Sequence, residues 1–226
     1  MENEKRTLME WVKRYVLCII GLFISALGVA FTRVADLGVS QVSSVANVLS
    51  CKFDFFTMGN WLICWNCLLI VLQIFILRKK FQIRQLFLQL IFSFMFGYFT
   101  DFGVWLFGGL KPESYIMRLI VVLAGAAIVA FGIAFNVIAE AVMNCGEAFV
   151  KAITDTIHKD FGHIKIAFDV CCVVATVILS LCLFNGKLVG VREGTVIAAV
   201  ITGFIINFFV RLMKPGLMKF IKSDAA

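Results

Sequence analysis

Acidic and amide side chains inside otherwise apolar segments are the residues of this sequence that could do chemistry. Asp101 lies between Tyr98 and Trp105, and Asp169 lies in the apolar stretch that follows Gly162. An ionisable side chain at the centre of a membrane-spanning helix costs about 2.5 to 3.5 kcal/mol, so it needs a partner or a water-filled cavity. The sequence therefore predicts that these carboxylates bind a cation or a polar, amine-bearing solute, or carry a coupling proton.

Further polar residues join these two aspartates in two predicted groups, which would form the two mouths of one pathway. The first group is Asp36, Asn66 and Asp101, with Arg33 as a further candidate; the second is Glu140, Asp169 and Asn207, with Asn136 beside them. We expect the carboxylates to coordinate the solute and the amides to hydrogen-bond with it. The alternative is structural, because such groups also cap helices and bond backbone groups freed at breaks in the chain. Arg33 and Arg118 are both expected to extend to the outer membrane surface, and the alternative for Arg33 is to pair with Asp36 or Asp101.

The elements that must position these residues are membrane-spanning helices. Hydrophobic residues make up 62% of the 226 residues, which is more apolar surface than a water-soluble domain of this size can bury. A spanning helix needs about 20 predominantly apolar residues. The sequence thus predicts an all-α integral membrane protein with a single membrane domain over residues 1–226. Its six expected spans are residues 15–34, 57–77, 86–107, 115–138, 164–184 and 195–212.

The chain contains an internal duplication. Residues 21–36 (GLFISALGVAFTRVAD) and residues 125–140 (GAAIVAFGIAFNVIAE) are identical at nearly half of their aligned positions. The first repeat covers about residues 13–110 and the second about residues 115–214. Because each repeat holds three spans, the second must be inverted relative to the first, which is a common construction among transporters.

The similarity continues through the later spans of each repeat. The aligned pairs are Gly59 with Gly162, Gly97 with Gly203, Asn66 with Asp169, and Asp101 with Asn207. In the first spans, glycines stand seven residues apart on one helix face, at Gly21 and Gly28 and at Gly125 and Gly132. Small residues on one face let two membrane helices approach closely. We therefore expect the first span to pack against the fourth.

A short polar segment follows the first span of each repeat. Residues 37–51 and residues 141–155 are too short and too polar to span a membrane, but their apolar residues recur at helical spacing. We expect each to form a short helix after a break in the chain, lying at the membrane surface or re-entering the membrane.

The positive charges predict the orientation of the chain. Most of the 21 Lys and Arg residues lie before the first span, after the sixth, and between spans two and three and spans four and five. Positive charge favours the cytoplasmic side, so both termini are expected in the cytoplasm. The net charge of +7 is thereby explained by topology, with the lipid bilayer as partner and no need for nucleic acid.

Several function classes remain open at this level. The preferred one is a small-solute permease, for which we expect no catalytic residues, metal or cofactor. The chain has no Walker A or Rossmann glycine pattern, so ATP hydrolysis and dinucleotide binding are not expected. The alternatives are a substrate-binding or accessory subunit of a partner protein, a structural or regulatory protein, and a membrane thiol enzyme that uses Cys64 and Cys67. Packing is the commoner role for cysteines inside a span. A homodimer is compatible with each class.

The chain also resembles the YczE/YitT group of small bacterial membrane proteins. The residues that carry the resemblance are LGVSQVSSVANVLS (37–50), Gly146-Glu147, FGHIKIAFDV (161–170) and GVREGTVIAAVITGFIINFF (190–209). Ser40-Gln41 and Asn144-Cys145 stand where the group has prolines. The resemblance implies a multi-pass protein of the bacterial cytoplasmic membrane, and it assigns no role to any residue.

Overall fold

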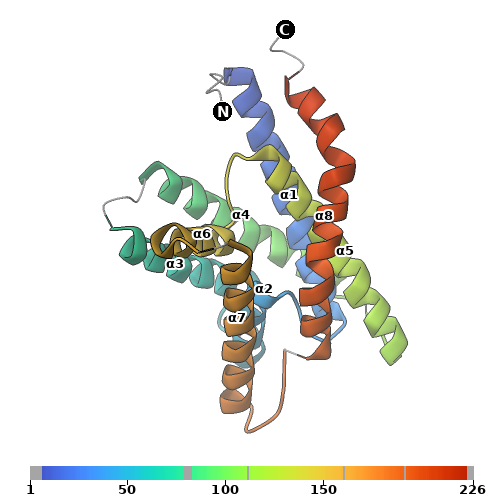
Figure 1. Cartoon of the computed structure of the whole chain (residues 1–226). Coiled ribbons are helices and arrows are strands. Elements are labelled where there is room, and N and C mark those ends of the chain that lie inside the picture. Colours follow the sequence, from blue (N-terminus) through green and yellow to red (C-terminus); the bar gives the residue numbers. More distant parts are fainter. Residues whose placement is uncertain (1–6, 79–82, 111, 160, 191, 223–226) are drawn as a thin grey trace.

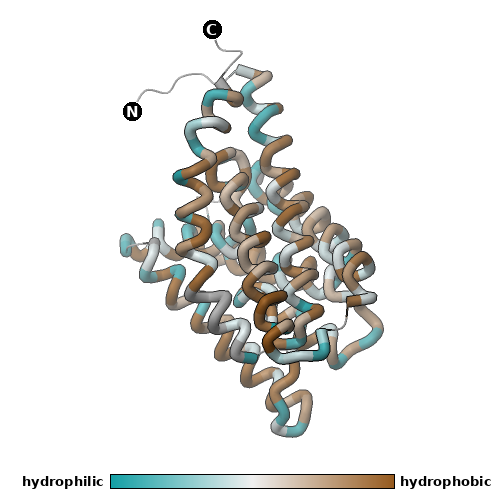
Figure 2. Tube along the Cα trace, turned by 90° about the vertical axis from the view of Figure 1, so that its right-hand side faces the viewer, coloured by the Kyte–Doolittle hydropathy of each residue, from teal (hydrophilic) through white to brown (hydrophobic). Residues whose placement is uncertain are grey.

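The computed structural model describes residues 7–78, 83–110, 112–159, 161–190 and 192–222, which form eight helices (Figure 1). These helices are α1 (Leu8–Val34), α2 (Gln41–Lys52), α3 (Met58–Leu77), α4 (Ile83–Phe107), α5 (Tyr115–Ala139), α6 (Cys145–Ile157), α7 (Phe161–Leu183) and α8 (Glu193–Lys222). All except α2 and α6 are long and apolar enough to cross a membrane, so the prediction of six spans is confirmed. Apolar residues run along these helices, and hydrophilic residues gather at their ends and in the loops (Figure 2).

Two of the long helices extend much further than their predicted limits. The first span was expected from residue 15, but α1 begins at Leu8, because the Thr7 hydroxyl caps it by accepting a hydrogen bond from the Glu10 N–H at 3.2 Å. The sixth span was expected to end at residue 212, but α8 continues through Pro215 to Lys222. Both errors have one cause: charged residues end an apolar pattern without ending the helix. The start of α1 and the end of α8 lie at the same end of the molecule (Figure 1).

The two short helices are present as predicted. A residue just after the preceding span adopts a left-handed conformation in both predicted repeats, with φ of 53° at Asp36 and 48° at Glu140. This conformation is unfavourable for residues other than glycine and cannot continue an α-helix. The chain therefore turns at the same position in each half, and α2 and α6 each lie against α3 and α7.

The crossing of α1 and α5 is the most extensive contact between two helices, as the glycine spacing predicts. A Cβ atom added at Gly21 would lie 2.6 Å from the Gly132 carbonyl oxygen, and one at Gly28 would lie 3.0 Å from the Gly125 oxygen. Only glycine permits such an approach of two backbones. The pairing of Gly21 with Gly132 and of Gly28 with Gly125 makes the two helices antiparallel.

The other helices are arranged around this pair. α4 packs on α1, and α8 packs on α5; α2 packs on α7, and α6 packs on α3. α3 also packs closely on α4, where a Cβ atom at Gly59 would overlap the Gly97 carbonyl oxygen. Among the described residues, α7 and α8 have no comparable contact, and a Cβ atom at Gly203 would meet nothing within 4 Å.

Candidate functional site

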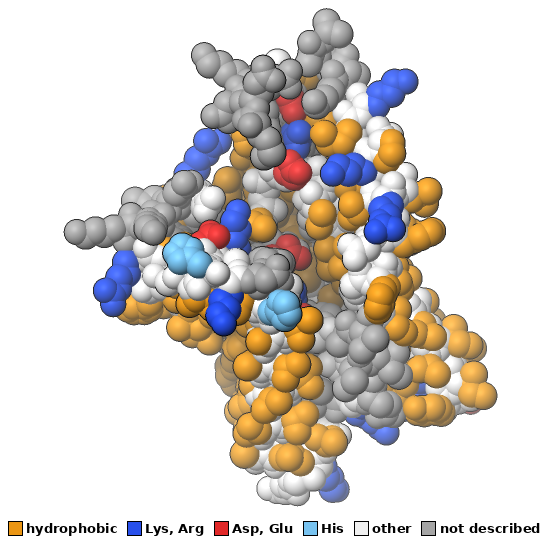
Figure 3. All heavy atoms as spheres, viewed as in Figure 1, with side chains coloured by type: hydrophobic (Ala, Val, Ile, Leu, Met, Phe, Trp, Pro, Cys, Tyr) orange, Lys and Arg blue, Asp and Glu red, His pale blue; other side chains and the backbone are white. Residues whose placement is uncertain are grey.

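A cavity of about 1050 Å³ lies among the C-terminal ends of α3 and α5, the N-terminal part of α4, and α6. Because α3 and α4 belong to the first predicted repeat and α5 and α6 to the second, each repeat supplies part of the wall. Charged side chains of both signs lie on the face that carries α6 (Figure 3). Those that line the cavity and are exposed are Arg78, Glu140, Lys151, Asp155 and His158.

Three amide side chains form the buried part of the cavity wall. Gln73, Gln89 and Asn136 are only 2%, 4% and 7% exposed. The Gln73 amide donates a hydrogen bond to the Cys145 carbonyl oxygen at 3.3 Å, which joins α3 to the start of α6. The Gln89 Oε1 atom and both polar atoms of the Asn136 amide have no hydrogen-bond partner among the described residues. A buried polar atom without a partner costs about 1 to 3 kcal/mol, so these atoms would gain free energy from any polar group that a movement of the helices brings to them.

Glu147 is a carboxyl group in the same cavity. It is the third residue of α6, a position from which a glutamate often bonds back to the capping residue. In the described part of the chain, however, no hydrogen bond or ion pair reaches this carboxyl group, and the Asn144 side chain makes no cap bond either. Burial is the main reason that the pKa of Glu147 is raised; the charge of Lys165 opposes the rise and that of Asp169 adds to it.

The predicted site residue Asp169 lies on α7 and is already paired. Both of its oxygens accept hydrogen bonds from the Lys165 ammonium group one turn earlier, with a distance of 2.7 Å to Oδ2. The pair is partly buried and close enough to Glu147 for both charges to affect its ionisation. Asp169 thus influences the cavity through its charge, although it does not line it.

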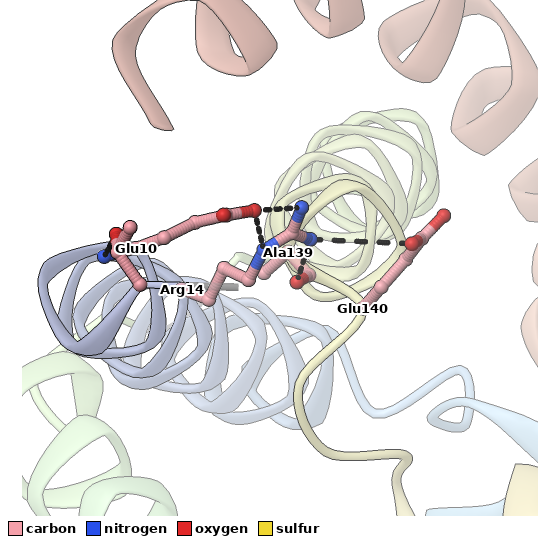
Figure 4. A network of polar contacts seen from close by, with 5 residues as sticks. Glu10, Arg14, Ala139 and Glu140 are labelled. Atoms are coloured by element: carbon pink, nitrogen blue, oxygen red, sulfur yellow. Dashed lines mark hydrogen bonds and ion pairs between the residues drawn. The ribbon is translucent and has the colours of Figure 1, made fainter. Parts of the chain in front are cut away.

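Arg14 holds the end of α5 beside the cavity (Figure 4). Its guanidinium group donates to the Ala139 carbonyl oxygen at 2.7 Å and to the Glu10 carboxylate at 2.8 Å, and it lies 3.9 Å from the Glu140 carboxylate. A cation at the C-terminus of a helix satisfies the last carbonyl groups and the helix dipole. The predicted site residue Glu140 is therefore placed at the cavity by the helix end that Arg14 fixes.

Loss of Arg14 is expected to destabilise the protein. Arg14 is 3% exposed, and Arg14→Ala would leave the Glu10 carboxylate without its cation, which costs about 3 to 5 kcal/mol. Thermal unfolding in detergent, followed by tryptophan fluorescence, measures the change. Lys187→Ala, at an exposed loop position, is the control and should remain within about 0.5 kcal/mol of the wild type. Equal stability of the two variants would contradict the assigned role of Arg14.

Asp101, the strongest carboxylate candidate of the sequence, belongs to α4, and its side chain lies beside the N-terminus of α3. Its carboxylate accepts hydrogen bonds from the Gly59 N–H at 2.7 Å and from the Thr57 hydroxyl at 2.6 Å. Thr57 in turn accepts the Asn60 N–H at 3.1 Å. The first N–H groups of a helix have no partner within the helix, so this carboxylate completes the cap of α3 and joins it to α4. Solute binding by Asp101 stays a prediction.

The capping geometry predicts a measurable effect on stability. Asp101→Ala should lower the free energy of unfolding by about 1 to 3 kcal/mol, because both bonds to a charged acceptor are lost. Asp101→Asn keeps a hydrogen-bond acceptor and should lower the free energy of unfolding by less. Thermal unfolding of the two variants beside the wild type tests this order, and an unchanged stability of Asp101→Ala would show that the cap contributes little.

The other predicted residues lie apart from the cavity. Asp36 is exposed and forms an ion pair with Arg118 at 3.9 Å, whereas the sequence left Arg33 open as an alternative partner for it. The antiparallel crossing of α1 and α5 causes this, since it places the start of α5 beside the end of α1. Asn66 is buried within α3, and Asn207 is exposed on α8. No hydrogen bond or ion pair joins Asp36, Asn66 and Asp101 to one another among the described residues.

The sequence interpretation did not single out Gln73, Gln89 or Glu147. The two glutamines lie inside predicted spans, and the rule that selected the in-span aspartates would also have found them if neutral amides had been included. Glu147 carried a weaker signal, since it lies in a short polar segment where charge needs no explanation. Cys64 and Cys67 are both free thiols, and Cys64 is exposed on α3.

Comparison with known proteins completes the description of the site. No curated protein and no solved structure matches the chain. The resemblance to the YczE/YitT group therefore stays a prediction. A family model described as "Family of unknown function (DUF6198)" matches residues 12–211, which is most of the chain. The chain accordingly belongs to the DUF6198 family.

Proposed function

We propose that the protein is a small-solute membrane permease that binds its solute in the cavity between two inverted three-span repeats. The observation that supports this most strongly is the unpartnered amide group of Asn136, with that of Gln89, in the wall of the cavity. Both side chains are more than nine-tenths buried, so protein atoms cover their unpartnered groups in this arrangement. A movement of the helices that uncovers them would let a polar solute supply the missing hydrogen bonds.

The inverted-repeat architecture is supported by the way in which the helices pair. Several contacts of one half have a counterpart in the other: α1 with α4 and α5 with α8, and α2 with α7 and α6 with α3. The first spans of the two repeats, α1 and α5, cross antiparallel along their glycines. Inverted repeats place a solute site near the middle of the membrane, where the two halves meet.

The positions that correspond to the three cavity amides support a state that is open on one side only. By the repeat alignment, Asn136, Gln73 and Gln89 correspond to Thr32, Thr176 and Thr195. These threonines are only 2%, 0% and 0% exposed. Thr176 is hydrogen-bonded to Ser44 at 2.8 Å, and a Cβ atom at Gly38 would overlap the Thr195 hydroxyl. The second half thus has close packing where the first half has a cavity.

The same asymmetry is present between the last two helices of each repeat. α3 and α4 are in contact through Gly59 and Gly97 and through the Asp101 cap, whereas Gly203, the counterpart of Gly97, faces open space. We infer that solute crosses when the two halves exchange these arrangements, so that α7 closes on α8 while α3 and α4 separate. With the charge distribution of the sequence, the present opening faces the cytoplasm.

Binding and uptake measurements on the purified protein alone, with no partner protein present, test this proposal. A thermal-shift screen against amino acids, polyamines, vitamins and inorganic cations should give at least one stabilising compound, and a ligand at 100 times its Kd adds about 2.7 kcal/mol. The compound found should then enter liposomes that contain this protein alone. Stabilisation without uptake would instead favour a binding subunit of a partner transporter. No stabilising compound and no uptake would overturn the proposal.

A further inference from the structure

The Glu147 carboxyl group lies in the proposed binding cavity and has no role in holding the fold. It is the third residue of α6, but it does not bond back to the helix cap, and no described side chain donates to it. The start of α6 is held by other bonds, from Gln73 to the Cys145 carbonyl oxygen and between the Ser93 hydroxyl and the Cys145 thiol. The carboxyl group is therefore available to a ligand.

The polar groups of the cavity wall indicate the chemical class of that ligand. The Glu147 carboxyl group and the Oε1 atom of Gln89 are acceptors in residues that line the cavity, and each lacks a donor among the described residues. The Oδ1 atom of Asn136 lies instead towards Gly21 of α1. An ammonium group carries three donors and one positive charge, so it complements a carboxylate together with a neighbouring amide oxygen.

The charged groups around Glu147 allow it to gain and lose a proton. Lys165 and Asp169 face it from α7 as an ion pair that is nearly neutral as a whole. Lys151 and Asp155 share its helix, and Glu140 of α5 and Arg78 at the end of α3 are exposed in the same cavity. Burial raises the pKa of Glu147, and no neighbouring cation forms an ion pair with it that would fully offset this effect.

We propose that Glu147 is the site at which a proton and an organic ammonium ion compete. The inference rests on the proposed permease function and specifies its solute class. In the empty cavity the raised pKa of Glu147 favours its protonated form. When the ammonium ion binds, the carboxyl O–H bond breaks, the proton passes to water in the cavity, and the carboxylate pairs with the ammonium group. One positive charge leaves the site for each one that arrives, so the protein exchanges protons for organic cations.

Carbodiimide labelling tests this competition. Dicyclohexylcarbodiimide reacts with protonated carboxyl groups in apolar surroundings, and mass spectrometry of peptides locates the adduct. We expect Glu147 to be labelled, with a yield that falls as pH rises through its raised pKa. Saturating spermidine or tyramine should lower the yield at least fivefold. Tetramethylammonium, which has the charge but no N–H donor, should protect much less.

Matched variants keep the test independent of folding. Glu147→Asp retains the carboxyl group and should be labelled, whereas Glu147→Gln should not. Glu113→Gln, at an exposed loop position, should behave as the wild type. Labelling of other carboxyl groups with none at Glu147, or labelling of Glu147 that neither amine lowers, would overturn the inference. If liposomes with Glu147→Gln still accumulated a solute in response to a pH gradient, the competition at Glu147 would be excluded but the permease function would be supported. If amines protected Glu147 from labelling but no solute crossed the membrane, the ammonium site would be supported and the permease function excluded.

Discussion

Asn136→Leu is expected to weaken solute binding while leaving the protein as stable as the wild type or more stable. Both polar atoms of the Asn136 amide are buried without a partner, so its burial costs desolvation free energy that leucine, which has the same branched skeleton of heavy atoms, does not lose. Replacing an unsatisfied buried polar group with an apolar one is neutral or stabilising, by up to about 1 to 3 kcal/mol.

The effect on the solute has the opposite sign. Hydrogen bonds to a charged ligand contribute about 1.5 to 3 kcal/mol, so binding should weaken about 10- to 100-fold. Thermal unfolding and ligand-induced stabilisation, measured on one preparation, report the two effects separately. Thr100→Val is the matched control, because Thr100 is fully buried but its hydroxyl bonds only to the Phe96 carbonyl oxygen and lies outside the cavity. Destabilisation by Asn136→Leu with unchanged binding would assign this amide to the fold.

Gly132→Leu should prevent folding altogether. A Cβ atom at Gly132 would lie 2.5 Å from the Gly21 carbonyl oxygen and 2.6 Å from the Ser25 backbone nitrogen. Both are backbone atoms of α1, so they can retreat only if the two central helices separate. Even Gly132→Ala should destabilise the protein by about 1 to 3 kcal/mol or more, which is typical of an overpacked core.

A second glycine separates this packing effect from helix propensity. Gly216, near the end of α8, would meet nothing within 4 Å if it gained a Cβ atom. Gly216→Ala should therefore stabilise the helix by up to about 1 kcal/mol, because alanine is the better helix former. Size-exclusion chromatography and thermal unfolding of the two alanine variants should show opposite changes. A stable, monodisperse Gly132→Leu protein would contradict the close crossing of α1 and α5.

The arrangement of the helices could largely be predicted from the sequence, because it follows from patterns within single segments. Apolar length marks the spans, and glycines seven residues apart mark the face on which α1 meets α5. Charged residues near a helix end do not mark where the helix begins, because residues such as Lys13 and Arg14 occur both before helices and in their first turns. For that reason the first and last helices are longer than expected.

The cavity could be predicted much less well, because it depends on how separate segments dock. Asp101 is as polar as any binding residue, but the N-terminus of α3 lies beside it and takes up its hydrogen bonds. Asn136 is less conspicuous in the sequence, but both of its amide atoms lack a partner among the described residues, and it lines the cavity at the end of α5. Depth within a span identifies polar residues that need a partner, and only the folded structure tells which of them has found one.

A cross-link between α7 and α8 tests the proposed exchange of the two halves between an open and a closed arrangement around this cavity. Cysteines would replace Gly162 and Gly203, the counterparts of Gly59 and Gly97, in a cysteine-free protein that also carries Ala148→Cys in the cavity wall. After mild oxidation in liposomes, a membrane-impermeant maleimide reports whether Cys at position 148 is accessible. If the two halves exchange in this way, positions 162 and 203 should form a disulfide, the maleimide reaction at position 148 should then be lost, and reduction of the disulfide should restore it. Failure of this disulfide to form, or an undiminished maleimide reaction at position 148 once it has formed, would rule out the exchange.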